Sequence, residues 1–112
     1  MEVAGKVWGR TKRLFSNGAI SLHRIFVRAG HECSKHSHQS KFNAFYVETG
    51  RLEITVWQPK GCVDVTELAP GEVMSVPPGV FHQFRAISDT VAFEWYWTEL
   101  REDDIQRETK GK

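Results

Sequence analysis

The sequence predicts an all-β fold, a sandwich or barrel of antiparallel strands, and two patterns lead to that prediction. Stretches rich in Val, Ile, Phe, Thr, Tyr and Trp recur and end at Gly or Pro residues, which is typical of short strands. The turn markers between Gly50 and Gly79 are 8 to 11 residues apart, a spacing that favours antiparallel strands over alternating strands and helices. Helix-length periodicity is missing until the C-terminal end of the chain.

Each strand is expected where an apolar or alternating stretch lies between turn markers. Ser16-Asn17-Gly18 predicts a hairpin turn between the first two strands. The last strand alternates, with Phe93 and Trp95 on one face and Glu94 and Tyr96 on the other. The expected strands are residues 6–15, 19–28, 33–37, 43–48, 51–58, 62–68, 73–76, 81–86 and 90–98.

The length of 112 residues fits one domain with a single core. We expect that domain to span residues 1–98 and to be followed by a charged tail, residues 99–112, in which nine of the fourteen residues are charged. Within the tail, residues 103–107 are expected to form one helical turn.

Charge and composition exclude several classes of protein. The net charge of +1 does not support a nucleic-acid binder that relies on bulk charge. No apolar run approaches the ~18 residues of a membrane span, so no membrane contact is expected. The two cysteines cannot form a disulfide framework, which favours a reducing, cytoplasmic setting.

The basic residues are concentrated near the N-terminus. Residues 1–41 hold eight Lys or Arg against two acidic residues, and residues 42–112 hold seven against twelve. Complementary strands that pair within one fold would explain this asymmetry. Recruitment of an anionic small molecule by the basic third would also explain it.

A pair of histidines marks the first candidate site. His36 and His38 are two apart, so on a strand both imidazoles project to the same side. Neutral imidazoles held close together favour a metal ion, because charging both rings would be repulsive.

A second stretch, residues 71–82, adds a third histidine. A Gly turn leads into a short apolar strand, Pro77-Pro78-Gly79 reverses the chain, and His82 opens the next strand. His82 has the same parity as Phe84 and should therefore point inward. An inward histidine among apolar residues is costly unless its nitrogens are satisfied, and a metal would satisfy one of them.

At these two stretches the chain resembles the cupin superfamily. Gly30, His36-x-His38 and Gly50 are similar to the first cupin motif, and Gly71, Pro77-x-Gly79 and His82 match the second. The resemblance covers about residues 30–86. It implies a small single-domain cupin, which is a double-stranded β-helix or jelly-roll barrel. It also implies a divalent metal ion (Mn, Fe, Ni or Zn) that is held by three histidines and usually one Glu, and a homodimer.

The chain departs from the family pattern at two positions. Asn43 stands where the family places Glu, and Ala86 stands where Asn is frequent. The metal ligands implied by the resemblance are therefore His36, His38, Asn43 and His82. Because all four donors are neutral, the ion would keep its full charge, and we expect lower affinity for hard ions such as Mn(II). The alternative is a barrel that has lost its metal.

Several further residues are assigned from their positions in the predicted strands and turns. Cys33 is either an extra ligand or a small buried hydrophobe, and Cys62 is expected to be buried as well. His23 and His31 are expected to be strand or surface residues, and Gln39 a polar turn residue or a ligand contact. The aromatic residues of the strands are expected in the core or in a dimer interface rather than in a sugar-stacking surface. These are Trp57, Trp95, Tyr96 and Trp97.

Charged residues within predicted strands are candidates for acid, base or carboxylate-binding roles, and the alternation does not choose among them. They are Arg24, Glu53, Arg85 and Glu94. Dimerisation is expected to use the unpaired edge of the basic first strand.

Three functions follow from the resemblance. The first is a metal-dependent enzyme that acts on a small polar substrate such as a sugar or sugar acid, as sugar-isomerase-like cupins do. The second is a non-catalytic cupin that binds a small ligand. The third is a non-haem Fe(II) dioxygenase, since three histidines with open positions are compatible with oxygen chemistry.

Overall fold

The computed structural model describes residues 2–99 and 102–111 and is built from nine β-strands. These described ranges contain no helix, so the all-β prediction is confirmed. Consistent with this, the described chain offers no helix that would be long and apolar enough to traverse a membrane. The strands are β1 (Glu2–Lys6), β2 (Gly9–Ser16), β3 (Ile20–Val27), β4 (Phe42–Thr49), β5 (Leu52–Trp57), β6 (Val63–Leu68), β7 (Val73–Val76), β8 (Phe81–Ala86) and β9 (Thr90–Trp97).

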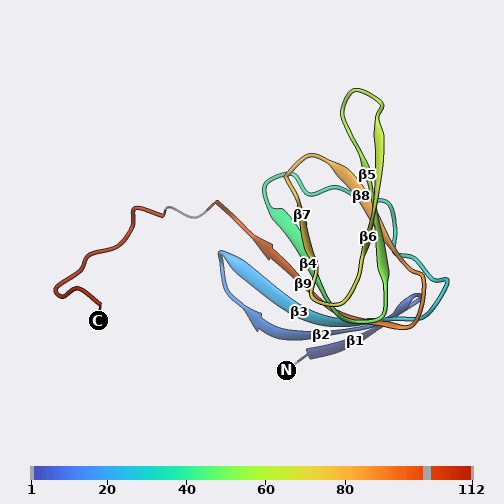
Figure 1. Ribbon diagram of the computed structural model, residues 1–112, viewed down its shortest axis with the longest axis horizontal. Coiled ribbons are helices and arrows are strands. Elements are labelled where there is room, and N and C mark those ends of the chain that lie inside the picture. The colour runs from blue at the N-terminus through green and yellow to red at the C-terminus, as the bar shows by residue number, and fades with distance from the viewer. Residues whose placement is uncertain (1, 100–101, 112) are drawn as a thin grey trace.

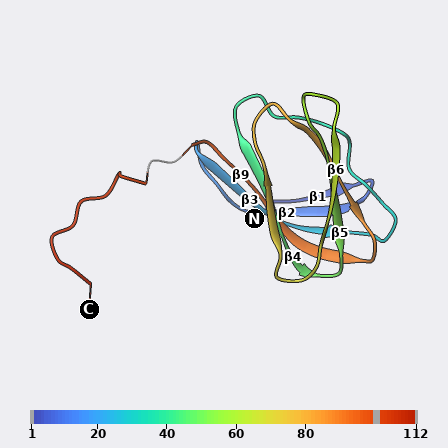
Figure 2. The same cartoon turned by 45° about the horizontal axis from the view of Figure 1, so that its top comes forward.

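The strands form two antiparallel sheets that face each other (Figures 1 and 2). The larger sheet has the order β1-β2-β3-β9-β4-β7, and the smaller has the order β6-β5-β8. β9 lies between β3 and β4, so strands far apart in the sequence become neighbours. This crossing pattern is that of a jelly roll and confirms the predicted architecture.

The core fills the space between the sheets with the inward-facing apolar residues of each strand. Alternation is clear in β5, where Leu52, Ile54 and Val56 are buried and the residues between them are half-buried. Phe45 and Phe84 meet edge to face, with ring centroids 6.0 Å apart, and join the two sheets. The two sheets thus meet through a core of apolar side chains, as a sandwich requires.

Two strand predictions are wrong. The stretch expected as one strand at residues 6–15 reverses at Val7 and Trp8, so that Lys6 pairs with Gly9 in a hairpin of β1 and β2. The stretch expected at residues 33–37 is a loop that forms a single bridge to β8, between His36 and His82, and a second bridge just before it joins Glu32 to Arg85. Ser, Lys and His in this stretch lack the β-branched side chains that sustain a strand.

Two further local predictions differ in outcome. The turn at residues 16–18 is a hairpin turn as expected, and the side chain of Asn17 accepts hydrogen bonds from the backbone of Ala19 and Ile20. The helical turn expected at residues 103–107 is wrong: the described tail residues adopt turns and irregular backbone.

Gly50 has a structural reason to be glycine. Its φ is +87°, in the left-handed region, and an added Cβ would lie 2.3 Å from the backbone oxygen of Asp89. Both the backbone conformation and the close approach therefore exclude a side chain at the turn between β4 and β5.

Candidate metal centre and the adjoining cavity

Three histidines from two separate segments lie close together. His36 and His38 come from the loop that precedes β4, and His82 comes from β8. One ring nitrogen of each lies within 4.8 Å of the others, and the ring centroids are 4.6 to 5.5 Å apart. The convergence expected from the sequence is therefore present.

Backbone hydrogen bonds fix the segments that carry these rings. His36 and His82 exchange two backbone hydrogen bonds, of 3.1 and 2.8 Å, across the bridge between the loop and β8. The carbonyl oxygen of His38 accepts a 2.7 Å hydrogen bond from the amide of Gly79. The turn of the second motif thus holds the loop of the first motif beside it.

The hydrogen-bond partners of the rings define which nitrogen is free. His36 Nδ1 lies 2.7 Å from the carbonyl oxygen of Ser34, and His82 Nδ1 lies 2.9 Å from that of Val80. Because a carbonyl oxygen can only accept, Nδ1 carries the hydrogen in both neutral rings. Their Nε2 lone pairs are then available to a cation, the orientation found in histidine metal ligands.

Asn43 completes the cluster. Its side-chain nitrogen donates to the carbonyl oxygen of Trp95 at 3.2 Å, which directs its oxygen toward His82 Nε2 at 2.9 Å. Asn43 and His82 are both buried. Two acceptor atoms therefore face each other in the interior, an arrangement that a cation would stabilise.

Two observations test whether these residues fit a metal ion. His38 Nε2 is buried and has no hydrogen-bond partner within the described part of the chain. Burial, helped by the neighbouring His36, Lys41 and His82, lowers the pKa of His38 to about 4. Burial also lowers the pKa of His82. Neutral rings with unsatisfied lone pairs are what a divalent ion requires, so the residues fit.

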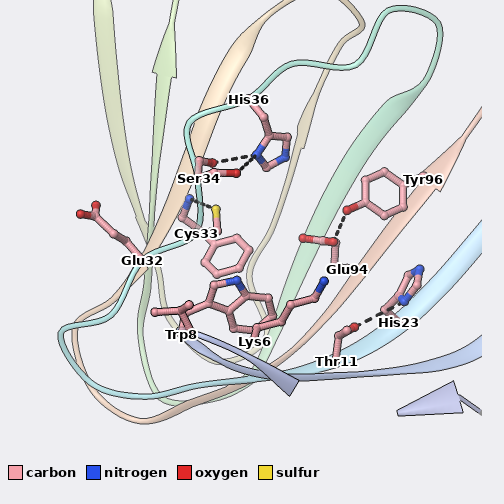
Figure 3. A pocket seen from close by; sticks show the side chains of 12 residues that line it. Lys6, Trp8, Thr11, His23, Glu32, Cys33, Ser34, His36, Glu94 and Tyr96 are labelled. Atoms are coloured by element: carbon pink, nitrogen blue, oxygen red, sulfur yellow. Dashed lines mark hydrogen bonds between the residues drawn. The ribbon is translucent and has the colours of Figure 1, made fainter. Parts of the chain in front are cut away.

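A cavity of about 460 Å³ opens beside His36 and extends toward the β1–β2 hairpin (Figure 3). This volume suits a small molecule. The polar residues that line it include Lys6, Thr11, His23, His36, Glu94 and Tyr96.

Glu94 is the buried acid of this cavity, with only 8% of its surface exposed. The hydroxyl of Tyr96 donates a hydrogen bond to its carboxylate (Figure 3). Burial raises the pKa of Glu94 to about 7, and burial together with Glu94 raises the pKa of Tyr96 above its usual range. A carboxyl group that titrates near neutrality is suited to proton transfer.

Strand register explains how Tyr96 connects the acid to the histidines. Tyr96 lies between Ser21 and Asn43 across the large sheet, two residues along β9 from Glu94. Its ring meets that of His38 edge to face, with centroids 5.0 Å apart. The phenol therefore contacts the histidine cluster with its ring and the carboxyl group with its hydroxyl.

The other predicted candidates lie elsewhere. His23 lines the cavity but is hydrogen-bonded to Thr11 and Ser21, and the cluster found among the described residues consists of His36, His38 and His82. Cys33 is buried, accepts a hydrogen bond from the Phe84 amide, and has a pKa raised by burial to about 12. It therefore acts as a small apolar residue. Cys62 is exposed, so its predicted burial is wrong.

From the sequence, Glu94 is only one of four charged residues within predicted strands, and Tyr96 is predicted to lie in the core or in an interface. Arg24 and Arg85 are exposed, and Glu53 is half-buried outside the cavity. Of the four charged candidates, Glu94 is therefore the one that lines the cavity. The signal that would have found both residues is the alternation of β9, provided that its polar face is assigned to the interior.

The chain belongs to the cupin family, because residues 23–99 match the cupin domain. A search of curated proteins found no match. Among solved structures, KdgF from a Halomonas species is similar, with a TM-score of 0.76, 16% identity, and coverage of 94% of this chain and 92% of that one.

Two longer proteins contain a similar unit. A capsular polysaccharide assembling protein, CapF from Staphylococcus aureus, has a TM-score of 0.77 at 16% identity, with 92% of this chain and 30% of that one covered. A variant of oxalate decarboxylase from Bacillus subtilis has a TM-score of 0.75 at 16% identity, with 88% and 27% covered. At this level of identity the similarity shows the fold.

Proposed function

We propose that this cupin is a metal-dependent enzyme that acts on a small polar substrate such as a sugar or sugar acid, in an isomerase-like reaction. The observation that carries the proposal is the cavity that is lined both by a titratable carboxyl group, Glu94, and by His36, one of the three convergent histidines. A binding cavity alone would not need a buried acid with a pKa near 7.

The proposed ligands of a divalent ion (Mn, Fe, Ni or Zn) are His36, His38, His82 and the amide oxygen of Asn43. Their support is the buried, unpartnered Nε2 of His38 and the opposed acceptor atoms of Asn43 and His82. A bound ion would polarise a carbonyl or hydroxyl oxygen of the substrate.

Glu94 is proposed to move the proton. Isomerisation of an aldose to a ketose moves one proton between neighbouring carbon atoms and a second proton between their oxygen atoms, and it needs no further reactant. One carboxyl group can accept the carbon-bound proton and return it, while the second proton passes from the hydroxyl oxygen to the carbonyl oxygen. Tyr96 keeps this carboxyl group oriented through its hydroxyl. The burial that raises the pKa of Glu94 keeps both of its protonation states populated near neutral pH.

A second candidate function is a non-catalytic module that binds a small ligand. It is favoured by the neutral Asn43, whose amide is already hydrogen-bonded to Trp95 and placed against His82. The third, an Fe(II) dioxygenase, requires only the histidines and an open coordination position.

One experiment separates the three functions. Metal-loaded protein is incubated in D₂O with aldoses, ketoses and sugar acids, and substrate C–H exchange and products are followed by NMR. The enzyme proposal predicts exchange and isomerised product, both lost in Glu94→Gln. Oxygen consumption with Fe(II) supports the dioxygenase, and a ligand-dependent thermal shift without product supports the binding module.

We also propose that two copies pair through the outer face of the large sheet. A shallow apolar groove there is lined by Ile20, Leu22, Tyr46, Phe93 and Trp95. An apolar sheet face of this kind is stabilised when a second copy covers it. The alternative is pairing along β1, which is an edge strand.

The domain is proposed to comprise residues 1–98, followed by the tail at residues 99–112.

Cys33 and Cys62 form no disulfide. Because unpaired cysteines persist in reducing compartments, we propose a cytoplasmic location.

A further inference from the structure

A lysine from the β1–β2 hairpin lines the cavity. Lys6 is the last residue of β1 and lines the same cavity as His36 and Glu94. Figure 3 shows its side chain extending into the cavity, with the amine directed toward Glu94 and above Thr11. The hairpin that replaces the predicted single strand is what brings this cation to the site.

Within the part of the chain that the structure describes, Lys6 forms no ion pair with a carboxylate. The ion pairs among the described residues join Arg24 to Glu48 and Arg51 to Glu67. Lys6 does act on Glu94 through its charge and lowers the pKa of that carboxyl group. Burial outweighs this effect and leaves the pKa of Glu94 near 7, so the acid is no permanent counter-charge.

Charged groups of both signs surround the cavity, and Glu94 is the acid toward which the amine of Lys6 is directed. Two acids line the cavity, Glu32 and Glu94, and Figure 3 shows the carboxylate of Glu32 directed away from the other side chains. A second cation, Lys41, lies 4.4 Å above the ring of Tyr96 and also lowers the pKa of Glu94. A divalent ion on four neutral ligands would add two further positive charges.

The hydroxyl group of Thr11 lies near Lys6 in the lining of the cavity. Thr11 Oγ1 is hydrogen-bonded to His23 Nδ1 at 3.4 Å, and His23 Nε2 is hydrogen-bonded to Ser21 Oγ at 2.8 Å. Thr11 lines the cavity from β2, and these hydrogen bonds direct its hydroxyl toward His23 (Figure 3). An ammonium and an adjacent hydroxyl together provide the charge and the donor that one carboxylate group requires.

We infer that Lys6 and Thr11 form a carboxylate subsite, and that Lys6 makes this cupin select sugar acids over the matching neutral sugars. The inference rests on the proposed function, because it assigns the other end of the same substrate. A phosphate dianion is recognised by several donors, commonly arginines or a helix N-terminus. Lys6 is the only lysine or arginine that lines this cavity among the described residues.

The test compares binding of D-glucuronate, D-galacturonate and D-mannuronate with that of glucose, galactose and mannose by isothermal titration calorimetry. The variants are Lys6→Gln and Thr11→Val. Lys12→Gln is the matched control, since Lys12 lies on β2 outside this cavity. Each protein is measured loaded with Zn²⁺ and after treatment with EDTA.

At least one sugar acid is expected to bind about tenfold tighter than its neutral sugar, as a charge-assisted hydrogen bond allows. Lys6→Gln should abolish that preference, Thr11→Val should weaken it, and Lys12→Gln should keep it. The preference should survive in EDTA, because it depends on Lys6. Equal binding of acid and neutral sugar, unchanged selectivity in Lys6→Gln, or no saturable binding of any sugar acid would overturn the inference.

Binding of glucose 6-phosphate is measured in the same way, to test whether Lys6 recognises a phosphate group instead of a carboxylate. Tighter Lys6-dependent binding of the phosphate than of any sugar acid would overturn the carboxylate assignment. Turnover is scored separately. A sugar acid that binds through Lys6 but is never converted would contradict the proposed enzyme and leave the subsite standing.

Discussion

The side-chain oxygen of Asn43 lies 2.9 Å from Nε2 of His82, and neither atom has a hydrogen to donate. The His82 ring gives its hydrogen to the carbonyl of Val80, and the Asn43 amide gives one to that of Trp95. Both groups are buried. Opposed acceptors in the interior raise the free energy of the metal-free site, and a cation that takes both lone pairs would remove that cost.

Asn43→Asp tests this relationship through the choice of metal. A carboxylate in place of the amide compensates part of the ion's charge and suits hard ions, so Mn²⁺ affinity should rise about tenfold or more. Asn43→Ala should lower the affinity for Zn²⁺ and Mn²⁺ alike. Competition titration with a fluorescent chelator measures both. Identical affinities in all three proteins would show that position 43 does not contact the ion.

Glu94→Gln tests the buried acid through the pH dependence of stability. Burial raises the pKa of Glu94 from its ordinary 4.5 to about 7 in the folded protein. Between those values the folded state holds more protons than the unfolded state, so Glu94 makes stability fall as pH rises from about 4.5 to 7. The loss is on the order of 3 kcal/mol.

Urea unfolding in EDTA at several pH values checks this prediction. The difference in unfolding free energy between wild type and Glu94→Gln should change across that window, since the histidines titrate in both proteins and cancel. Glu53→Gln serves as the control, because Glu53 lies outside the cavity. A difference that is independent of pH would mean that Glu94 titrates near its ordinary value.

Phe93→Glu tests the proposed dimer. Phe93 lies on the outer face of β9 in the apolar groove, where a buried carboxylate would oppose pairing of two copies. Light scattering after size exclusion should give a dimer for wild type and a monomer for the variant. Val65→Glu, at an exposed valine of the small sheet, should remain dimeric. A monomeric wild-type protein would refute the proposal.

Gly50→Ala tests the turn between β4 and β5. The added methyl group would lie 2.3 Å from the Asp89 backbone oxygen, in a left-handed conformation. Strain and the clash together should cost more than about 2 kcal/mol of unfolding free energy. Gly61→Ala has the same φ of +87° with open space around it, and should cost about 1 kcal/mol. Equal losses in the two variants would contradict the clash.

The sequence predicted most strands because their apolar residues alternate between clear turn markers. The local pattern predicted that His36 and His38 share a side and that His82 points inward, and the resemblance to cupins implied that the three histidines meet. The reversal at Val7 and Trp8 could not be predicted, since both residues favour strands and their turn depends on Trp8 packing against Phe84.

The inward direction of Glu94 could not be predicted for a different reason. Burial of the most apolar face would turn Phe93 and Trp95 of β9 inward, yet the face with Glu94 and Tyr96 points to the interior. The register with β3 and β4 fixes this orientation. The expectation that the most apolar face of a strand is buried fails for β9, because the barrel interior holds a polar site and the outer face holds the apolar groove.

The most direct test of the metal centre is elemental analysis of tag-free protein after incubation with Zn²⁺ and removal of free ions. The wild-type protein and His31→Ala, a control at an exposed histidine outside the cluster, should each retain about one ion per chain. His82→Ala should retain almost none while remaining folded by circular dichroism. A wild-type protein that keeps no stoichiometric metal, or a His82→Ala protein that binds it equally well, would contradict the site.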